Sequence, residues 1–178
     1  MARLPVPDLP PGVIRPVVTA PNPVLATVSA TVRPDDPEVV QLAADLLATM
    51  VVSPGCVGLA ANQVGVAWRV FCVDVTRHPK TGKCHGSFVL VNPVVGSATR
   101  KERAREGCMS VPDFTGDVRR ASRLVVAGQL PGTGDWVELV TDAFEARALQ
   151  HELDHVDGLL FLDRVAGSHA IHPRRRYQ

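Results

Sequence analysis

The sequence predicts an α+β fold, in which mixed or antiparallel strands pack around a central helix and a second helix lies near the N-terminus. Segments 36–51 and 143–157 show helical periodicity, and most of the β-branched runs lie between them. Few helical segments separate these runs, so the crossovers of a parallel sheet are missing. The 178 residues, 46% of them apolar, suffice for one domain with its own core.

The first helix is expected to begin at Asp35-Asp36-Pro37, because an acidic N-cap followed by proline in the first turn is typical of a helix start. Apolar residues then follow at helical spacing. Ser53-Pro54-Gly55 is expected to end this helix. The apolar positions are Val40, Ala43, Leu47 and Met50.

Strands are expected wherever β-branched and aromatic residues cluster between turn signals. Pro93 indicates an edge position or a bend, and Pro131-Gly132 predicts a turn. The charged stretch 100–106 is interpreted as an exposed strand. The full set of expected strands is 68–75, 88–95, 100–106, 118–129 and 136–140.

The second helix carries the clearest capping signals. Asp142 can cap its start, and Glu145 three residues later resembles a capping box. Gly158 is well placed to end the helix in a left-handed conformation. One face of this helix is expected to carry Phe144, Ala148, His151 and His155.

Composition narrows the class of protein. A net charge of +1 and a pI near 7.8 give no broad electrostatic case for DNA or membrane binding. No stretch has the ~18 apolar residues of a membrane helix, and the N-terminus lacks the apolar core of a secretory signal. A cytoplasmic protein is expected, with its four cysteines acting as thiols or ligands. We expect a Pro-rich extended arm at 1–12, a catalytic domain at 13–166 and a polar basic tail at 167–178.

The segment His151-Glu152-Leu153-Asp154-His155 carries the strongest chemical signal. Two histidines at i and i+4 project from one helix face, where one divalent metal can bridge them. Glu152 stands beside the first histidine, where its carboxylate can take a proton from water activated by the metal. A solvated histidine pair on a surface helix is the alternative.

A catalytic metal site needs a third protein ligand. Cysteines, the other histidines and acidic residues are candidates, and Cys108 stands out in Glu106-Gly107-Cys108-Met109-Ser110. Its thiolate is a strong soft ligand, and Gly107 allows the backbone to pass closely. Taken alone, a cysteine is more often a small buried apolar residue than a metal ligand.

The segment 56–63 contributes small residues that let a substrate backbone approach. Gln63 offers an uncharged amide donor, which suits a developing oxyanion. Small residues after a helix also serve packing or turns, so this segment alone indicates little.

Together the three segments resemble the peptide deformylase family. That family carries the ordered motifs GxGLAAxQ, EGCxS and QHExDHxxG. Here they read CVGLAANQ (56–63), EGCMS (106–110) and QHELDHVDG (150–158), in matching order and spacing. The flanking segments 22–32 and 159–165 also look familial, so the resemblance covers about residues 13–166.

The resemblance implies a role for each matching residue. Cys108, His151 and His155 match the metal ligands, and Glu152 matches the general base and acid. The Gln63 amide and the Met109 backbone N–H match the oxyanion donors. Gly58 matches a glycine whose backbone binds substrate, and Glu106 matches an acid that we interpret as structural, paired with Arg119 or Arg120.

Two positions depart from the family pattern. Cys56 replaces the first glycine of the first motif, with Pro54-Gly55 before it, and Met109 replaces a commoner leucine. The second change is expected to be mild, because Met109 would act through its backbone. The pocket for a methionine-like first side chain is expected to be lined by Cys56, Val57, Phe144 and Ala148.

The resemblance implies hydrolysis of the formyl group from N-formylmethionyl nascent peptides, with release of formate. It points to one Fe²⁺ ion, for which Zn²⁺, Ni²⁺ or Co²⁺ can substitute in preparations. Arg174–Arg176 could touch ribosomal RNA, or could form a solvated end. Two alternatives stay open: a zinc peptidase of the HExxH type using His169 or His172, and an inactive paralogue that binds formylated peptides.

Overall fold

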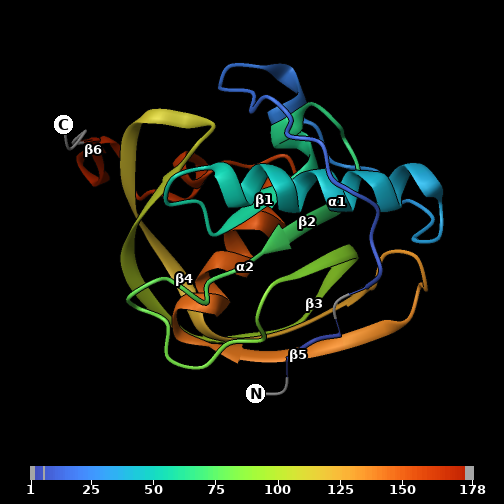
Figure 1. Cartoon of the computed structure of the whole chain (residues 1–178). Coiled ribbons are helices and arrows are strands. Elements are labelled where there is room, and N and C mark those ends of the chain that lie inside the picture. Colours follow the sequence, from blue (N-terminus) through green and yellow to red (C-terminus); the bar gives the residue numbers. More distant parts are fainter. Residues whose placement is uncertain (1–2, 6, 175–178) are drawn as a thin grey trace.

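The computed structural model describes residues 3–5 and 7–174, and these form an α+β fold (Figure 1). Six strands make an antiparallel sheet in the order β1-β2-β3-β4-β5, with β6 paired to β4. The strands are β1 Gly58–Ala60, β2 Val70–Val73, β3 Phe88–Cys108, β4 Val111–Gln129, β5 Trp136–Asp142 and β6 Ile171–Pro173. The helices are α1 Pro37–Val52 and α2 Ala143–Val156, with short 3₁₀ turns η1 Pro23–Ala26, η2 Ala61–Val64, η3 Phe161–Arg164 and η4 Ser168–Ala170.

Helix α1 confirms the first helical prediction to within one residue at each end. Asp36 is the N-cap, and its side chain accepts a hydrogen bond from the Glu38 N–H at 2.9 Å. Pro37 occupies the first turn, where its missing N–H costs no hydrogen bond. Ser53 caps the other end, as the sequence indicated.

Helix α2 is also confirmed, but its predicted capping box is wrong. Asp142 stands at the N-cap without making a side-chain cap hydrogen bond. The Glu145 carboxylate instead accepts hydrogen bonds from the His85 N–H at 2.8 Å and the Thr141 hydroxyl at 2.6 Å. These buried partners come from elsewhere in the fold and outcompete the local cap. Gly158 has φ +74°, as expected for the residue that ends the helix.

The central strands are longer than the sequence predicted. The expected strands 88–95 and 100–106 are one strand, β3, whose register shifts twice between Val91 and Ser97. Pro93 lies at the first shift, an irregularity within a strand that is paired on both sides, so the edge position that the sequence also allowed is wrong. Strand β4 begins at Val111 rather than at 118, because its first residues complete a long hairpin with β3. The turn at 131–133 contains the predicted Pro131-Gly132, and strand β5 matches its prediction.

Alternation along β2 explains how two helices share one sheet. Phe71 and Val73 pack with α2, whereas Val70 and Cys72 pack with α1. Both faces are therefore apolar, and the strand reads as a continuous hydrophobic run. In Figure 1, α1 (cyan) lies across the front of β1 and β2, with α2 (orange) behind them, and the β3–β4 hairpin curves around α2.

Several features lay beyond the sequence patterns. Strand β1 and the 3₁₀ turns consist of short segments without periodicity, and β6 arises within the expected basic tail. The N-terminal segment has no regular structure over its described residues, and Gly12 lies against the α1 backbone with no room for a side chain. All four cysteines are free thiols. Within residues 3–5 and 7–174, no helix combines the length and the apolar character required to cross a bilayer.

Candidate metal centre and substrate cavity

Three potential metal ligands converge where the β3–β4 hairpin meets α2. The ligand atoms of Cys108, His151 and His155 all lie within 4.8 Å of one another. Cys108 Sγ and His155 Nε2 are 3.2 Å apart. Cys108 ends β3, while the two histidines occupy successive turns of α2. The packing of β4 against α2 thus joins two segments that are distant in sequence.

The donor set fits a divalent metal. Ligands at about 2.3 Å (sulfur) and 2.0 Å (nitrogen) around a tetrahedral ion lie roughly 3.5 Å apart, close to the Cys108–His155 separation. Cys108 and His155 are buried, so the centre is sheltered from bulk water. Three protein ligands also leave a coordination position for water or substrate, which is the arrangement of a catalytic site rather than a structural one.

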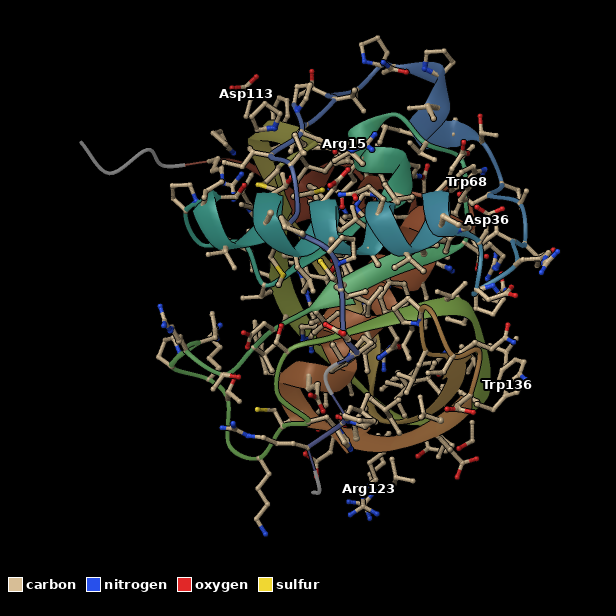
Figure 2. All side chains as sticks on the ribbon, turned by 45° about the vertical axis from the view of Figure 1, so that its right-hand side comes forward. Arg15, Asp36, Trp68, Asp113, Arg123 and Trp136 are labelled. Carbon is tan, nitrogen blue, oxygen red and sulfur yellow. The ribbon has the colours of Figure 1, made fainter. Side chains whose placement is uncertain are left out.

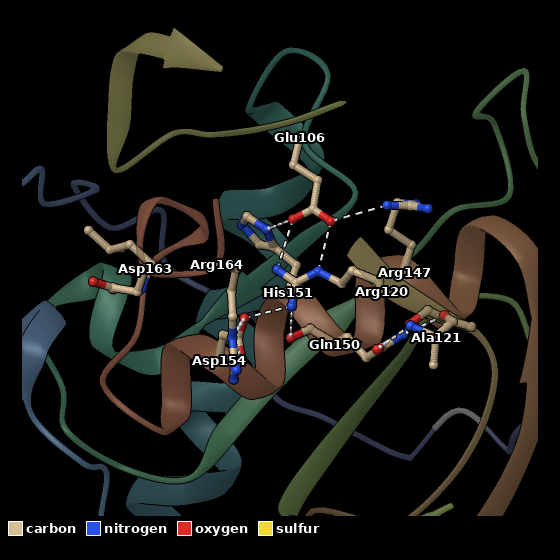
Figure 3. Close-up of polar contacts among 11 residues, drawn as sticks. Glu106, Arg120, Ala121, Arg147, Gln150, His151, Asp154, Asp163 and Arg164 are labelled. Carbon is tan, nitrogen blue, oxygen red and sulfur yellow. Dashed lines mark hydrogen bonds and ion pairs between the residues drawn. The ribbon is translucent and has the colours of Figure 1, made fainter. Parts of the chain in front are cut away.

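A buried ionic network orients His151 (Figure 3). His151 Nδ1 lies 3.1 Å from Glu106 Oε2. Arg120 donates to both oxygens of Glu106 at 2.7 and 2.8 Å, and to Asp154 at 2.6 Å. With Nδ1 engaged by Glu106, His151 presents Nε2 to the metal centre. Arg164 also contacts Asp154, which extends the network to η3.

The charge of Glu106 is set by this network. Burial alone would raise its pKa, but hydrogen bonds from His151 and Arg120, together with the Arg120 charge, lower the pKa to about 2. Of the two arginines that the sequence offered, Arg120 is the partner, whereas Arg119 is exposed. The contact with His151 was not foreseen, because sequence spacing does not reveal pairing across the hairpin and α2.

Glu152 faces the same cavity from α2. Its side chain is buried, and burial raises the pKa of its carboxyl to about 7. Among the described residues, Oε2 has no hydrogen-bond partner. A Cβ on Gly58 would lie 2.5 Å from Glu152 Oε1, so the glycine is required for the carboxylate to occupy this position. The carboxylate is therefore poised to exchange a proton near neutral pH.

Gln63 is held with its amide nitrogen toward the metal centre. The Ala60 N–H donates to Oε1 at 3.0 Å, which fixes the orientation of the amide. Nε2 then donates to Ser110 Oγ at 3.1 Å and to Cys108 Sγ at 3.4 Å. The N–H directed at Cys108 thus points into the centre. Met109 lies in the turn between β3 and β4, next to Cys108.

A cavity of about 300 Å³ opens beside these groups. Every substrate-binding residue expected from the sequence lines it, and so do Gln63, Met109 and Glu152. Cys56 donates its thiol to the Gly58 carbonyl at 3.1 Å, and burial raises the pKa of that thiol to about 12. It therefore stays protonated at neutral pH. The expected residues are Cys56, Val57, Gly58, Phe144 and Ala148.

Sequence reasoning missed the basic side chains of this cavity. Arg147 lines it from α2, beside Phe144 and Ala148, and Arg105, Lys80 and Arg174 also line it. Arg147 follows Phe144 by three residues, a spacing that could have placed it there. Arg174 could not be placed from sequence, because its position depends on β6. Its guanidinium donates to the Cys108 carbonyl at 3.2 Å.

The alternative third ligands do not join the centre. His172 lies in β6, with Nε2 3.1 Å from Asp117 Oδ2, and His169 lies in η4. Over the described ranges 3–5 and 7–174, the metal-ligating group found is Cys108 with the two histidines of α2. The geometry therefore gives no support to a peptidase that would use a downstream histidine as third ligand.

Fold and site together define a metallohydrolase: a Cys/His/His centre, a carboxylate beside it and a cavity for substrate. Residues 14–170 match the model of the family described as polypeptide deformylase. The chain belongs to this family.

Individual relatives agree with this assignment. The Rhizobium meliloti (strain 1021) peptide deformylase is 38% identical over 154 residues, 86% of each sequence. The Desulforudis audaxviator (strain MP104C) peptide deformylase is 43% identical over 151 residues, 84% of this chain and 92% of that one. Among solved structures, the Acinetobacter baumannii class I type b peptide deformylase bound to Met-Ala-Ser has a TM-score of 0.78 at 34% identity, covering 86% of this chain and 100% of that chain.

Proposed function

We propose that the cavity beside Cys108, His151 and His155 binds formylated N-termini of nascent polypeptides, whose formyl group is hydrolysed there. The observation that carries this proposal is the position of a buried, unpaired Glu152 carboxylate next to a three-ligand metal centre. A structurally similar deformylase binds Met-Ala-Ser, a peptide that begins with methionine. Family membership supports the same reaction and its metal dependence.

The residues divide the work of amide hydrolysis. Water adds to the formyl carbon, Glu152 accepts its proton, and the same carboxyl then protonates the leaving amine as the C–N bond breaks. Formate and a free N-terminus result. The Gln63 amide and the Met109 N–H donate to the developing oxyanion, and such donors contribute about 2.7–4 kcal/mol each in comparable chemistry. The Gly58 backbone lines the cavity in which the substrate chain would lie.

The first substrate side chain packs against the cavity wall formed by Cys56, Val57, Phe144 and Ala148. These side chains are mostly apolar, which suits a flexible thioether such as methionine. His78 also lines the cavity and stacks on Phe144 with ring centroids 3.8 Å apart, a contact that holds the Phe144 ring in the wall.

One divalent metal held by Cys108, His151 and His155 supplies Lewis acidity, which lowers the pKa of water and polarises a carbonyl oxygen. One thiolate and two imidazoles suit Fe²⁺, Zn²⁺, Co²⁺ and Ni²⁺. We propose Fe²⁺ as the native ion. Metal analysis of anaerobically purified protein tests this choice, and Zn²⁺ in stoichiometric amount with full activity would contradict it.

We further propose that the protein acts in the cytoplasm, where nascent chains emerge. Residues 13–166 would form the catalytic domain, with 1–12 as an arm and 167–178 as a basic tail. The tail segment Arg174–Arg176 could contact ribosomal RNA through its charge. Two of its arginines, 175 and 176, lie outside the described residues.

Formate release from formyl-Met-Ala tests the catalytic assignment. Glu152→Gln should retain its metal but lose turnover by at least ~10³-fold, because the proton acceptor is removed from both proton transfers. Cys108→Ala serves as the contrast, since it should lose metal as well as activity. Substantial formate release by metal-loaded Glu152→Gln protein would refute the role of Glu152, and unchanged metal content in Cys108→Ala would exclude Cys108 as a ligand.

A further inference from the structure

Four cationic side chains line the cavity outside the metal centre, and we call them the basic rim: Lys80, Arg105, Arg147 and Arg174. Among the described residues that line the cavity, the acidic ones are Glu106 and Glu152, both beside the metal ligands. Glu106 is already held by Arg120, which lies behind it. The approach to the cavity therefore carries an excess of positive charge, although the whole chain is nearly neutral.

Arg147 is the least exposed member of the rim. Its side chain is 13% exposed, and its Nη1 lies 3.5 Å from Glu106 Oε1, a long contact. The same Glu106 oxygen accepts a much shorter hydrogen bond of 2.7 Å from Arg120. A guanidinium has five N–H donors. Within residues 3–5 and 7–174, the Arg147 side chain makes no other hydrogen bond, so most of its guanidinium donors remain available to a bound ligand.

The outer members of the rim also retain donors. Arg105 uses Nε for Asp117 at 3.1 Å, and Asp117 also contacts Arg103 and His172, so its single charge does not neutralise both arginines. Arg174 uses Nη1 for the Cys108 carbonyl, a neutral acceptor. These guanidiniums come from β3, α2 and the segment after β6, and the fold brings them to one cavity.

We propose that the basic rim makes this enzyme prefer formylated chains with acidic side chains directly after the first residue. This inference rests on the proposed function, in which the first side chain of the substrate packs against the apolar wall. The substrate residues that follow it must then pass the basic rim. Carboxylates there would find guanidinium donors in a partly desolvated setting, where such pairs are stronger than at an open surface.

Three C-terminally amidated peptides test the preference: formyl-Met-Asp-Asp, formyl-Met-Asn-Asn and formyl-Met-Lys-Lys. The metal-loaded enzyme should show a kcat/KM for the Asp peptide roughly fivefold above that for the Asn peptide, with the Lys peptide lowest. The difference should appear mainly in KM. It should shrink between about 0.05 M and 0.5 M salt, because the Debye length falls.

Substitutions in the basic rim test whether its arginines cause the preference for acidic residues. Arg147→Gln and Arg105→Gln should each move the Asp/Asn ratio of kcat/KM toward one. Arg123→Gln is the matched control, because Arg123 is exposed on β4, does not line the cavity and projects from the lower edge of the molecule in Figure 2. It should leave the ratio unchanged.

The outcomes distinguish a failure of this inference from a failure of the proposed function. Equal kcat/KM for the Asp and Asn peptides at low salt would overturn the substrate preference while leaving deformylation intact. No formate release from any peptide would overturn the proposed function and the inference together. If the rim variants weaken ribosome co-sedimentation but leave the peptide ratio unchanged, the rim binds RNA and the inference is wrong.

Discussion

Replacing Glu106 with glutamine separates the contribution of its charge from that of its shape. The carboxylate receives hydrogen bonds from Arg120 at 2.7 and 2.8 Å and lies 3.1 Å from His151 Nδ1. These partners lower its pKa from 4.5 to about 2. At about 1.4 kcal/mol per pKa unit, the ionised form contributes up to about 3 kcal/mol to the free energy of unfolding.

The sign of the pH dependence follows from the lowered pKa. The folded state holds Glu106 ionised more strongly than the unfolded state does, so the stabilisation is complete above about pH 4.5. It is lost as the pH falls from 4.5 toward 2. Urea unfolding of metal-free wild type and Glu106→Gln should therefore differ by up to about 3 kcal/mol at neutral pH and converge in acid.

A difference of the same size at pH 7 and pH 3 would refute this reasoning, because it would mean that shape rather than charge accounts for the loss. Metal affinity provides a second measurement. Since Glu106 orients His151, the variant should bind its metal about 10–100-fold more weakly.

Two further substitutions test the packing around the site. Gly58→Ala should displace the Glu152 carboxylate, because the new Cβ would lie 2.5 Å from Oε1, and should lower kcat about 10²-fold while metal content stays unchanged. Gly82→Ala is the control, because a Cβ there meets nothing within 4 Å. Equal activity of the two variants would contradict the expected displacement. Arg120→Met should cost about 3–5 kcal/mol in chemical denaturation, because Glu106 and Asp154 lose their shared buried partner. Exposed Arg119→Met should cost almost nothing, and similar losses in the two arginine variants would argue against the buried network.

The parts of the fold that depend on local periodicity were predictable from sequence. Helical spacing was enough to place His151 and His155 on one face of α2, and the continuous apolar run through β2 matches a strand covered on both sides. These predictions hold because the tertiary packing of each element favours the same conformation as its local sequence does.

The parts of the fold that depend on partners distant in sequence were not predictable. Glu145 has the spacing of a capping box, yet His85 and Thr141 claim its carboxylate once the fold closes. The charged stretch 100–106 shows no apolar alternation, so its continuity with β3 comes from pairing with β4. Arg147 was not among the residues that the sequence placed at the cavity, because its position there depends on how the β3–β4 hairpin packs against α2.

The contact of Arg174 with the Cys108 carbonyl bears on when the centre can form during synthesis. Translation delivers Gln63, Cys108 and the α2 histidines in that order, but the segment that braces the β3–β4 turn emerges after all of them. Domains that fold during synthesis do so as their residues leave the ribosome. A partly synthesised copy of this chain would therefore present its candidate metal ligands before the support behind Cys108 exists, and the complete site would form only after β6 has paired with β4.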